Sequence, residues 1–181
     1  MFLFGDESIP SLDLLTSAIA TVHHAPLPPI NKTPTGKPYF PTHPHWHFNL
    51  SHSKEFVVCA LGETPLGVDI QCCRVGSPSL IKRVCSAEEV AWLATQPNQG
   101  LGFACLWTLK ESFVKYRGDG VGNGIKLATL PTPLPSTLSP FQTLESEGLF
   151  YHLWTHPRFA LALCTHEIIP PTLEWLSPLH S

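Results

Sequence analysis

The chain has 181 residues, a length that suits one domain or two small halves packed as one unit. Hydrophobic residues make up 43% of it, which is enough for a core and excludes wholesale disorder. The formal net charge of −3 argues against nucleic-acid binding, because contacts to phosphates need an excess of lysine and arginine. We also expect no membrane span, because no apolar run approaches the ~20 residues that such a helix requires.

Both the amino terminus and the cysteines favour a cytoplasmic protein. Residues 1–10 include two acids but no basic stretch, so they do not resemble a secretory signal. The six cysteines contain no Cys-x-x-Cys pair, and several of them lie in apolar runs. We therefore expect reduced cysteines that pack in the core.

The first part of the chain predicts one helix, a long loop and three strands. Apolar residues recur at positions 12, 15, 19 and 22, which makes one helical stripe over residues 11–22. Residues 25–44 carry seven prolines, so we expect an extended loop there. Short turns then separate three apolar segments, a spacing that is typical of an antiparallel meander. The expected strands cover residues 46–50, 56–61 and 66–70, with a polar turn at 51–54.

The second part predicts two helices and a second meander. Ser86 followed by Glu89 forms a capping box, which indicates a helix that runs to about Thr95. A longer helix is expected over residues 101–117, with glycines at 118 and 120 to end it. The remaining expectations are an irregular segment at 121–140, strands at 141–145, 149–155 and 158–165, and a short strand or ordered coil at 170–181.

The order of these elements predicts an α+β fold with two similar halves, each a small antiparallel sheet with a packed helix. The first half covers residues 1–75 and the second covers residues 76–181, and we expect them to form one compact unit. No repeat of 20–50 residues is visible, so the likeness between the halves lies in the order of their elements alone.

Three charged residues are the strongest candidates for chemistry. Asp69 ends an otherwise apolar strand, where burial of a carboxylate is costly unless a cation lies against it. Glu111 and Lys115 are four residues apart, so both project from one face of the long helix. Taken separately, each has a simpler explanation. Glu111 and Lys115 could form an exposed salt bridge along the helix, and Asp69 could begin a turn.

A second set of candidates is rich in hydrogen-bond donors. Ser51, His52 and Ser53 follow a strand and could bind a phosphate, or could form an ordinary polar turn. Adjacent residues in a strand point to opposite faces, so a nucleophilic Ser-His pair is disfavoured. Lys37 lies in a Gly-Lys-Pro loop and could bind a phosphate or simply be solvated.

The four motifs together resemble the Sfp-like 4′-phosphopantetheinyl transferases. They run in the order Gly-Lys-Pro at 36–38, Phe-Asn-Leu-Ser-His-Ser at 48–53, Gly-Val-Asp-Ile at 67–70 and Trp-Thr-Leu-Lys-Glu-Ser-Phe-Val-Lys at 107–115. The resemblance implies two halves related by a pseudo-twofold axis, with the active site in the cleft between them. It implies transfer of 4′-phosphopantetheine from coenzyme A to a serine of an acyl or peptidyl carrier protein, with release of adenosine 3′,5′-bisphosphate. Magnesium is the cofactor that it implies.

The resemblance also implies a role for each candidate residue. Asp69 and Glu111 match the carboxylates that hold the metal, and Glu111 also matches the group proposed to accept the serine proton. Lys115 matches the lysine that holds the pyrophosphate and neutralises the leaving group. Lys37, Ser51 and His52 match residues that bind the phosphates of coenzyme A.

Two features of the sequence depart from the family pattern. Gln71 stands where many relatives have a third acidic metal ligand, so this position has an amide that is at most a neutral ligand. The first half is short, and no lysine or arginine precedes Lys32, whereas relatives usually carry basic residues there. These departures leave open a rival function, a carrier-protein or coenzyme A binding relative with little or no turnover. A magnesium-dependent phosphohydrolase is a further alternative, and the sequence does not decide between a monomer and a homo-oligomer.

Overall fold

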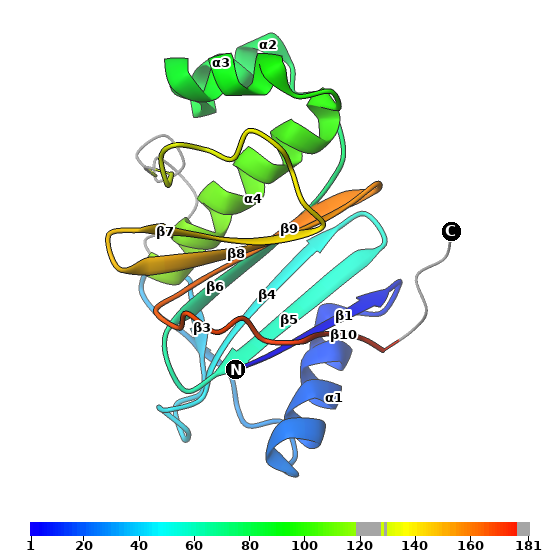
Figure 1. The fold of residues 1–181 in the computed structure, drawn as a ribbon. Helices are drawn as coiled ribbons and strands as arrows, with labels where there is room; N and C mark the ends of the chain where they lie inside the picture. Colours follow the sequence, from blue (N-terminus) through cyan, green and yellow to red (C-terminus); the bar gives the residue numbers. More distant parts are fainter. Residues whose placement is uncertain (119–127, 129, 177–181) are drawn as a thin grey trace.

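The protein has an α+β fold in a computed structural model that describes residues 1–118, 128 and 130–176. Helix α1 covers one sheet, helix α4 covers a second sheet, and the two sheets pack against each other between the helices (Figure 1). The elements are β1 (Phe2–Glu7), α1 (Ser11–His23), β2 (Asn31–Lys32), β3 (Pro38–Tyr39), β4 (His47–Ser53), β5 (Phe56–Gly62), β6 (Leu66–Cys72), α2 (Pro78–Val84), α3 (Ala87–Thr95), α4 (Gln99–Arg117), β7 (Phe141–Ser146), β8 (Leu149–His156), β9 (Phe159–Thr165) and β10 (Leu173–Trp175).

The two sheets have the strand orders β10-β1-β5-β4 and β6-β9-β8-β7. All neighbours within them are antiparallel except β1 and β10, which are parallel. The predicted second meander is confirmed as β7, β8 and β9. The first meander is wrong in its last strand, because β6 pairs with β9 and not with β5. The turn after β5 carries the chain from one sheet to the other, a change of partner that local turn signals do not reveal.

The two sheets share one pattern of connection. When β2, β3, α2, α3 and β7 are left out, the units β1-α1-β4-β5 and β6-α4-β8-β9 each run strand, helix, strand, strand, and in each the first strand lies beside the last. The order β1-β5-β4 in one sheet therefore corresponds to β6-β9-β8 in the other. A twofold relation between the units stays a prediction.

Several local predictions are confirmed and others are wrong. Helix α1, the capping box of α3 and the left-handed cap of α4 at Gly118 all occur as expected. The expected polar turn at 51–54 is wrong, because β4 continues to Ser53 and the chain reverses at Lys54 and Glu55. Strand β1 and helix α2 were not predicted, although Ser77 and Pro78 are a recognisable helix start. Residues 119–127 and 129 of the expected irregular segment, and 177–181 of the tail, lie outside the described residues.

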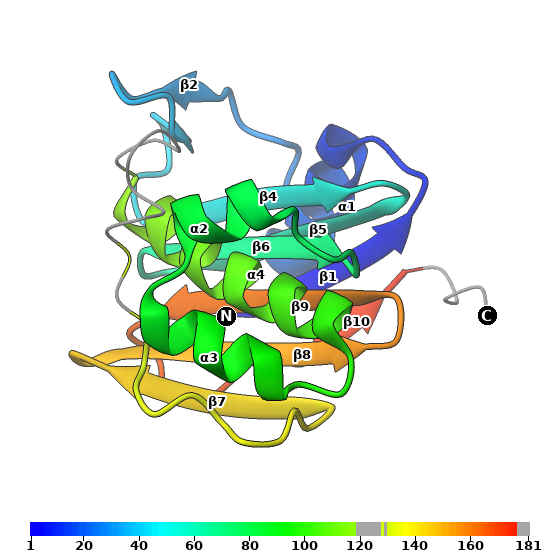
Figure 2. The same cartoon turned by 90° about the horizontal axis from the view of Figure 1, so that it is seen from above.

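The core has three layers that follow the alternation of side chains along the strands. The middle layer lies between the sheets, and α1 and α4 each cover an outer layer. Figure 2 shows α2, α3 and α4 gathered on the side of the second sheet. Within the described ranges, no helix is long and apolar enough to cross a membrane.

Helix α4 approaches β6 most closely at Gly67. A Cβ atom built on Gly67 would lie 2.2 Å from the carbonyl oxygen of Ser112 and 2.2 Å from the backbone nitrogen of Tyr116. Only glycine fits between this strand and this helix, because real Cβ contacts are not this short. The contact sets the distance between α4 and the side chains that follow Gly67 on the same face of β6, beginning with Asp69.

We predict that Gly67→Ala lowers the free energy of unfolding by about 1–3 kcal/mol or more, because the methyl group must push the α4 backbone away from β6. Gly100→Ala is the matched control, since a Cβ there meets its nearest atoms at 3.4–3.5 Å in an ordinary helical position. The control is expected to change stability by no more than about 1 kcal/mol, because alanine favours helix over glycine. Urea unfolding of the two variants measures the difference, and equal effects would contradict the close approach.

Candidate active site

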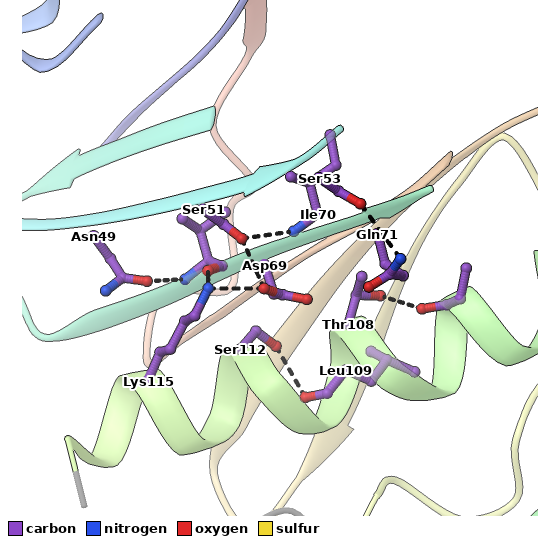
Figure 3. A network of polar contacts seen from close by, with 12 residues as sticks. Asn49, Ser51, Ser53, Asp69, Ile70, Gln71, Thr108, Leu109, Ser112 and Lys115 are labelled. Atoms are coloured by element: carbon purple, nitrogen blue, oxygen red, sulfur yellow. Dashed lines mark hydrogen bonds and ion pairs between the residues drawn. The ribbon is translucent and has the colours of Figure 1, made fainter. Parts of the chain in front are cut away.

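Two carboxylates from different elements are buried where β6 meets α4. Asp69 and Glu111 are 6% and 4% exposed. The Oδ1 atom of Asp69 accepts a hydrogen bond from the Ser51 hydroxyl at 2.7 Å and one from Lys115 Nζ at 2.7 Å (Figure 3). Lys115 Nζ also donates to the carbonyl oxygen of Val68 at 3.1 Å. The explanation of Glu111 and Lys115 as an exposed salt bridge is therefore wrong, because Glu111 is buried and Lys115 reaches across to β6.

Burial works against the charge of both carboxylates. It raises the pKa of Asp69, and the opposing effects of Lys115 and of the Ser51 hydrogen bond are smaller. Burial, and after it the negative charge of Asp69, raises the pKa of Glu111 to about 7, while Lys115 lowers it. The site therefore has more negative charge than Lys115 offsets, which favours uptake of a proton or a cation.

One oxygen of each carboxylate is buried without a hydrogen-bond partner among the described residues, namely Asp69 Oδ2 and Glu111 Oε1. Such oxygens fit a hard cation, because Mg²⁺ is commonly held by one or two carboxylates together with water and phosphate oxygens. In the part of the chain that the structure describes, no group of three or more histidine, cysteine or acidic residues could hold a metal ion. A cation at this pair would thus take its remaining ligands from water or from a substrate.

Gln71 lies two residues beyond Asp69 and so on the same face of β6. Its Nε2 atom donates to the Ser53 hydroxyl at 3.3 Å and to the carbonyl oxygen of Cys72 at 3.2 Å. These bonds hold the amide nitrogen against β4. The role of Gln71 as a metal ligand stays a prediction.

The loop lysine is tied to the same region. Lys37 Nζ donates to the carbonyl oxygen of Tyr116 at 2.8 Å and to that of Leu66 at 3.5 Å, so it joins the loop to the last turn of α4 and to β6. Burial lowers the pKa of Lys37. Lys37 and Lys115 line one cavity of about 220 Å³, to which Gly36, Asn49, Leu50 and Val114 also contribute. Two cations therefore face one cavity beside the buried carboxylates.

Ser51 and His52 are placed differently from each other. Ser51 is buried and contacts Asp69, whereas His52 is exposed and, as its neighbour in the strand, points to the opposite face of β4. The structure thus brings Lys37, Ser51 and Lys115 to the site. His52 lies on the other face of β4, although its charge still acts to lower the pKa of Asp69. Binding of phosphate by these residues stays a prediction.

Three alternate side chains of β4 bind the open edge of β6. Asn49 Oδ1 accepts from the backbone N–H of Val68 at 2.8 Å and Ser51 Oγ accepts from that of Ile70 at 3.3 Å (Figure 3). Ser53 Oγ accepts from the backbone N–H of Cys72 at 3.0 Å. We call this set of three bonds the β4–β6 seam. Asn49 had no role of its own in the sequence interpretation, and Ser53 was expected to bind a phosphate or to lie in a polar turn. Their spacing of two residues was the signal, because polar side chains that alternate along a strand share one face.

A second buried ion pair fixes the opposite side of α4. Lys110 Nζ lies 2.9 Å from Glu89 Oε2, and both side chains are less than a tenth exposed. Glu89 also completes the capping box of α3 by accepting from the backbone N–H of Ser86. Trp107 packs against the core beside Phe103, as expected of a residue that supports the helix. These contacts hold α4 while its other face carries Glu111.

Comparison with known proteins gives a family match over this region. The model of the 4′-phosphopantetheinyl transferase superfamily matches residues 65–164, which include β6 and α4. The chain is 38% identical over 136 residues to 4′-phosphopantetheinyl transferase psf-1 of Bacillus pumilus, which covers 73% of this chain and 58% of that protein. It is 40% identical over 88 residues to 4′-phosphopantetheinyl transferase Sfp of Bacillus subtilis, which covers 48% of this chain and 39% of Sfp.

A third relative extends the comparison to another bacterial group. The chain is 37% identical over 123 residues to 4′-phosphopantetheinyl transferase AcpT of Salmonella typhimurium, which covers 65% of this chain and 62% of AcpT. In all three comparisons the chain spans less than two thirds of the length of the relative. The resemblance drawn from the motifs is confirmed.

We predict that the stability of the metal-free protein falls as the pH rises from about 4.5 to about 7, and that Glu111→Gln reduces this fall. The pKa of Glu111 rises from an ordinary 4.5 to about 7 on folding, so the folded state binds more protons than the unfolded state in this window. The stabilisation that comes from the protonated Glu111 is complete below pH 4.5 and is lost as the pH rises through about 7. At pH 8 the variant should be more stable by about 1–3 kcal/mol. Urea unfolding at pH 5 and pH 8 with a chelator tests this, and an identical pH dependence in both proteins would contradict it.

Proposed function

We propose that this chain, which belongs to the 4′-phosphopantetheinyl transferase superfamily, transfers 4′-phosphopantetheine from coenzyme A to a serine of an acyl or peptidyl carrier protein. The second product is adenosine 3′,5′-bisphosphate. The single observation that supports this most strongly is the buried pair Asp69 and Glu111 beside Lys115, within the region that matches the family. A domain that only bound a carrier protein would have no need of this costly arrangement.

In the proposed reaction the serine oxygen attacks the phosphorus that carries the pantetheine group. A new P–O bond forms, the P–O bond to the adenosine bisphosphate breaks, and its electron pair leaves with that product. Glu111 accepts the serine proton. Burial raises the pKa of Glu111 to about 7 in the site without a metal ion, so before a cation binds this group is a stronger base than an ordinary carboxylate.

The two lysines of the cavity would handle the phosphates. Lys115 would bind the pyrophosphate and offset the negative charge that grows on the leaving group. Lys37 lines the same cavity and would bind a phosphate of coenzyme A, although its ammonium group also holds the end of α4. His52 stays a proposed phosphate ligand.

Asp69 and Glu111 are the residues that would hold Mg²⁺, with Gln71 as an uncertain third ligand. Their unpartnered oxygens fit this ion. When bound, Mg²⁺ supplies positive charge at the pyrophosphate. In the absence of the metal, the direct contact of Lys115 with Oδ1 would partly offset the cost of burying an ionised Asp69.

Further features belong to the same proposal. The units β1-α1-β4-β5 and β6-α4-β8-β9 would form two halves related by a pseudo-twofold axis, with the boundary before β6 instead of after residue 75 and the site between the halves. The described cavity agrees with this arrangement, since Lys37 and Asn49 line it from one side and Lys115 from the other. We also propose a cytoplasmic location.

We predict that Asp69→Ala abolishes transfer, with a loss of at least about 100-fold, because it removes a carboxylate that would hold the metal. The assay follows the mass of an apo-acyl carrier protein incubated with coenzyme A, Mg²⁺ and this protein, and a gain of one phosphopantetheine marks turnover. Asp13→Ala, which removes an exposed acid of α1, is the control and should leave the rate unchanged. Full turnover by a folded Asp69→Ala variant would refute the metal role. No mass gain with the unchanged protein would favour the binding relative.

We predict that Gln71→Glu tightens Mg²⁺ binding to the protein free of coenzyme A, because it adds a charged oxygen two residues from Asp69. The Ser53 hydroxyl can support this change, since it accepts from the Cys72 N–H and its own proton can turn to a carboxylate. A tighter ground-state metal need not raise the rate. Titration of both proteins with Mg²⁺, with and without coenzyme A, is the measurement. Equal affinities without coenzyme A would show that residue 71 does not reach the metal.

A further inference from the structure

The hydroxyl proton of Ser51 is already used within the protein. A serine hydroxyl carries one proton and two lone pairs. Ser51 Oγ accepts the backbone N–H of Ile70 at 3.3 Å and lies 2.7 Å from Asp69 Oδ1, a carboxylate oxygen that can only accept. The serine proton therefore points to Asp69. It is not available to a phosphate while this bond exists.

We propose that Ser51 is a positioning residue that fixes the orientation of the Asp69 carboxylate and keeps Oδ2 as its free oxygen. This inference rests on the proposed function, in which Asp69 holds a metal ion. It differs from the phosphate-binding role that the family resemblance implies for Ser51.

The contacts of Asp69 support this assignment. Ser51 Oγ and Lys115 Nζ both donate to Oδ1 at 2.7 Å, while Oδ2 is buried and has no hydrogen-bond partner among the described residues. Two donors on the same oxygen restrict rotation of the carboxylate. The oxygen that is left open is the one that can bind a cation.

The proposed reaction separates the roles of the two donors. Lys115 has a long side chain, is partly exposed and would turn toward the pyrophosphate of coenzyme A. Ser51 is 6% exposed and sits on a paired strand, where its backbone is fixed by the bond pattern between β4 and β5. When Lys115 engages the substrate, Ser51 is the donor of these two that stays on Oδ1. Partners of this kind typically influence metal affinity or activity 10–100-fold.

Ser53 provides a matched control within the same strand. Ser51 and Ser53 each accept one backbone N–H of β6 through the hydroxyl, so removal of either hydroxyl takes one bond from the β4–β6 seam. Ser53 Oγ also accepts from Gln71 Nε2 at 3.3 Å, so Ser53→Ala measures the loss of the seam bond together with the release of Gln71. Only Ser51 bonds to Asp69. Comparison of Ser51→Ala with Ser53→Ala therefore separates the effect on the carboxylate from the effect on the seam.

The experiment titrates the unchanged protein and both variants with Mg²⁺ by calorimetry, without and with coenzyme A, and measures kcat and the KM for coenzyme A. Thermal unfolding confirms that each variant is folded. We expect Ser51→Ala to weaken Mg²⁺ binding 10–100-fold and to lower kcat, with less than a threefold change in the KM for coenzyme A. Ser53→Ala should weaken Mg²⁺ binding less than threefold. Should Ser51→Ala fail to fold, Ser51→Cys keeps the volume with a weak donor and should show the same loss.

Three results would overturn the assignment. An increase in the KM for coenzyme A with unchanged Mg²⁺ affinity would make Ser51 a phosphate ligand. Equal losses of Mg²⁺ affinity in Ser51→Ala and Ser53→Ala would show that both residues act only through the β4–β6 seam. Absence of Mg²⁺ binding by the unchanged protein would show that there is no Mg²⁺ site for Ser51 to support. The titration needs no carrier protein, so a lack of transfer would refute the proposed function and still leave the role of Ser51 decided.

Discussion

The open edge of β6 is the constraint on which the rest of the site depends. A strand at the edge of a sheet leaves every second N–H and C=O group unpaired, and such groups are costly when they are buried. In this protein the β4–β6 seam provides the acceptors for three of these N–H groups. Lys115 and Lys37 donate to carbonyl oxygens along the same edge. The edge of β6 is thus satisfied by side chains instead of by another strand.

This solution places chemistry where a neighbouring strand would otherwise lie. A paired strand would fill the space with backbone, whereas serine and lysine side chains leave room for a cavity and contribute a hydroxyl and ammonium groups. On the face of β6 toward α4 the requirement is a close approach. Gly67 has no side chain there, so the helix can pack directly against the strand. Side chains on one face of a strand recur every second residue, so Gly67 is followed on the same face by Asp69 and then by Gln71. One strand therefore fixes both the position of the helix and the acid that faces it.

The sequence predicts those parts of the structure that depend on neighbours in the chain. The amphipathic stripe of α1, the capping box of α3 and the hairpins of β7, β8 and β9 all rest on local signals, and all occur. The pairing of β6 with β9 joins residues 87 to 99 positions apart, from Cys72 with Phe159 to Leu66 with Thr165, and no local pattern predicts it. Of the site, Asp69, Glu111 and Lys115 were identified by their motif, and the structure places Lys115 on Asp69. The serines at 51 and 53 were assigned to a turn because polar residues after a strand usually form one, whereas here their alternation serves the β4–β6 seam.

The two buried acids differ in how far hydrogen bonds and ion pairs offset the cost of their burial, and this difference suits them to different roles. Asp69 receives a lysine and a hydroxyl on one oxygen, so a specific orientation of its carboxylate is stabilised. Glu111 has one oxygen without any hydrogen-bond partner among the described residues and lies in the field of Asp69, so its pKa rises further toward neutrality. A protein optimised only for stability would avoid such a pair, because buried carboxylates destabilise the folded state unless they are compensated. Proteins retain arrangements of this kind where a bound cation or a moving proton provides the compensation during function. The pair therefore combines one carboxylate that is held in place with one whose pKa lies near neutrality, a combination that the proposed transfer to a serine would use.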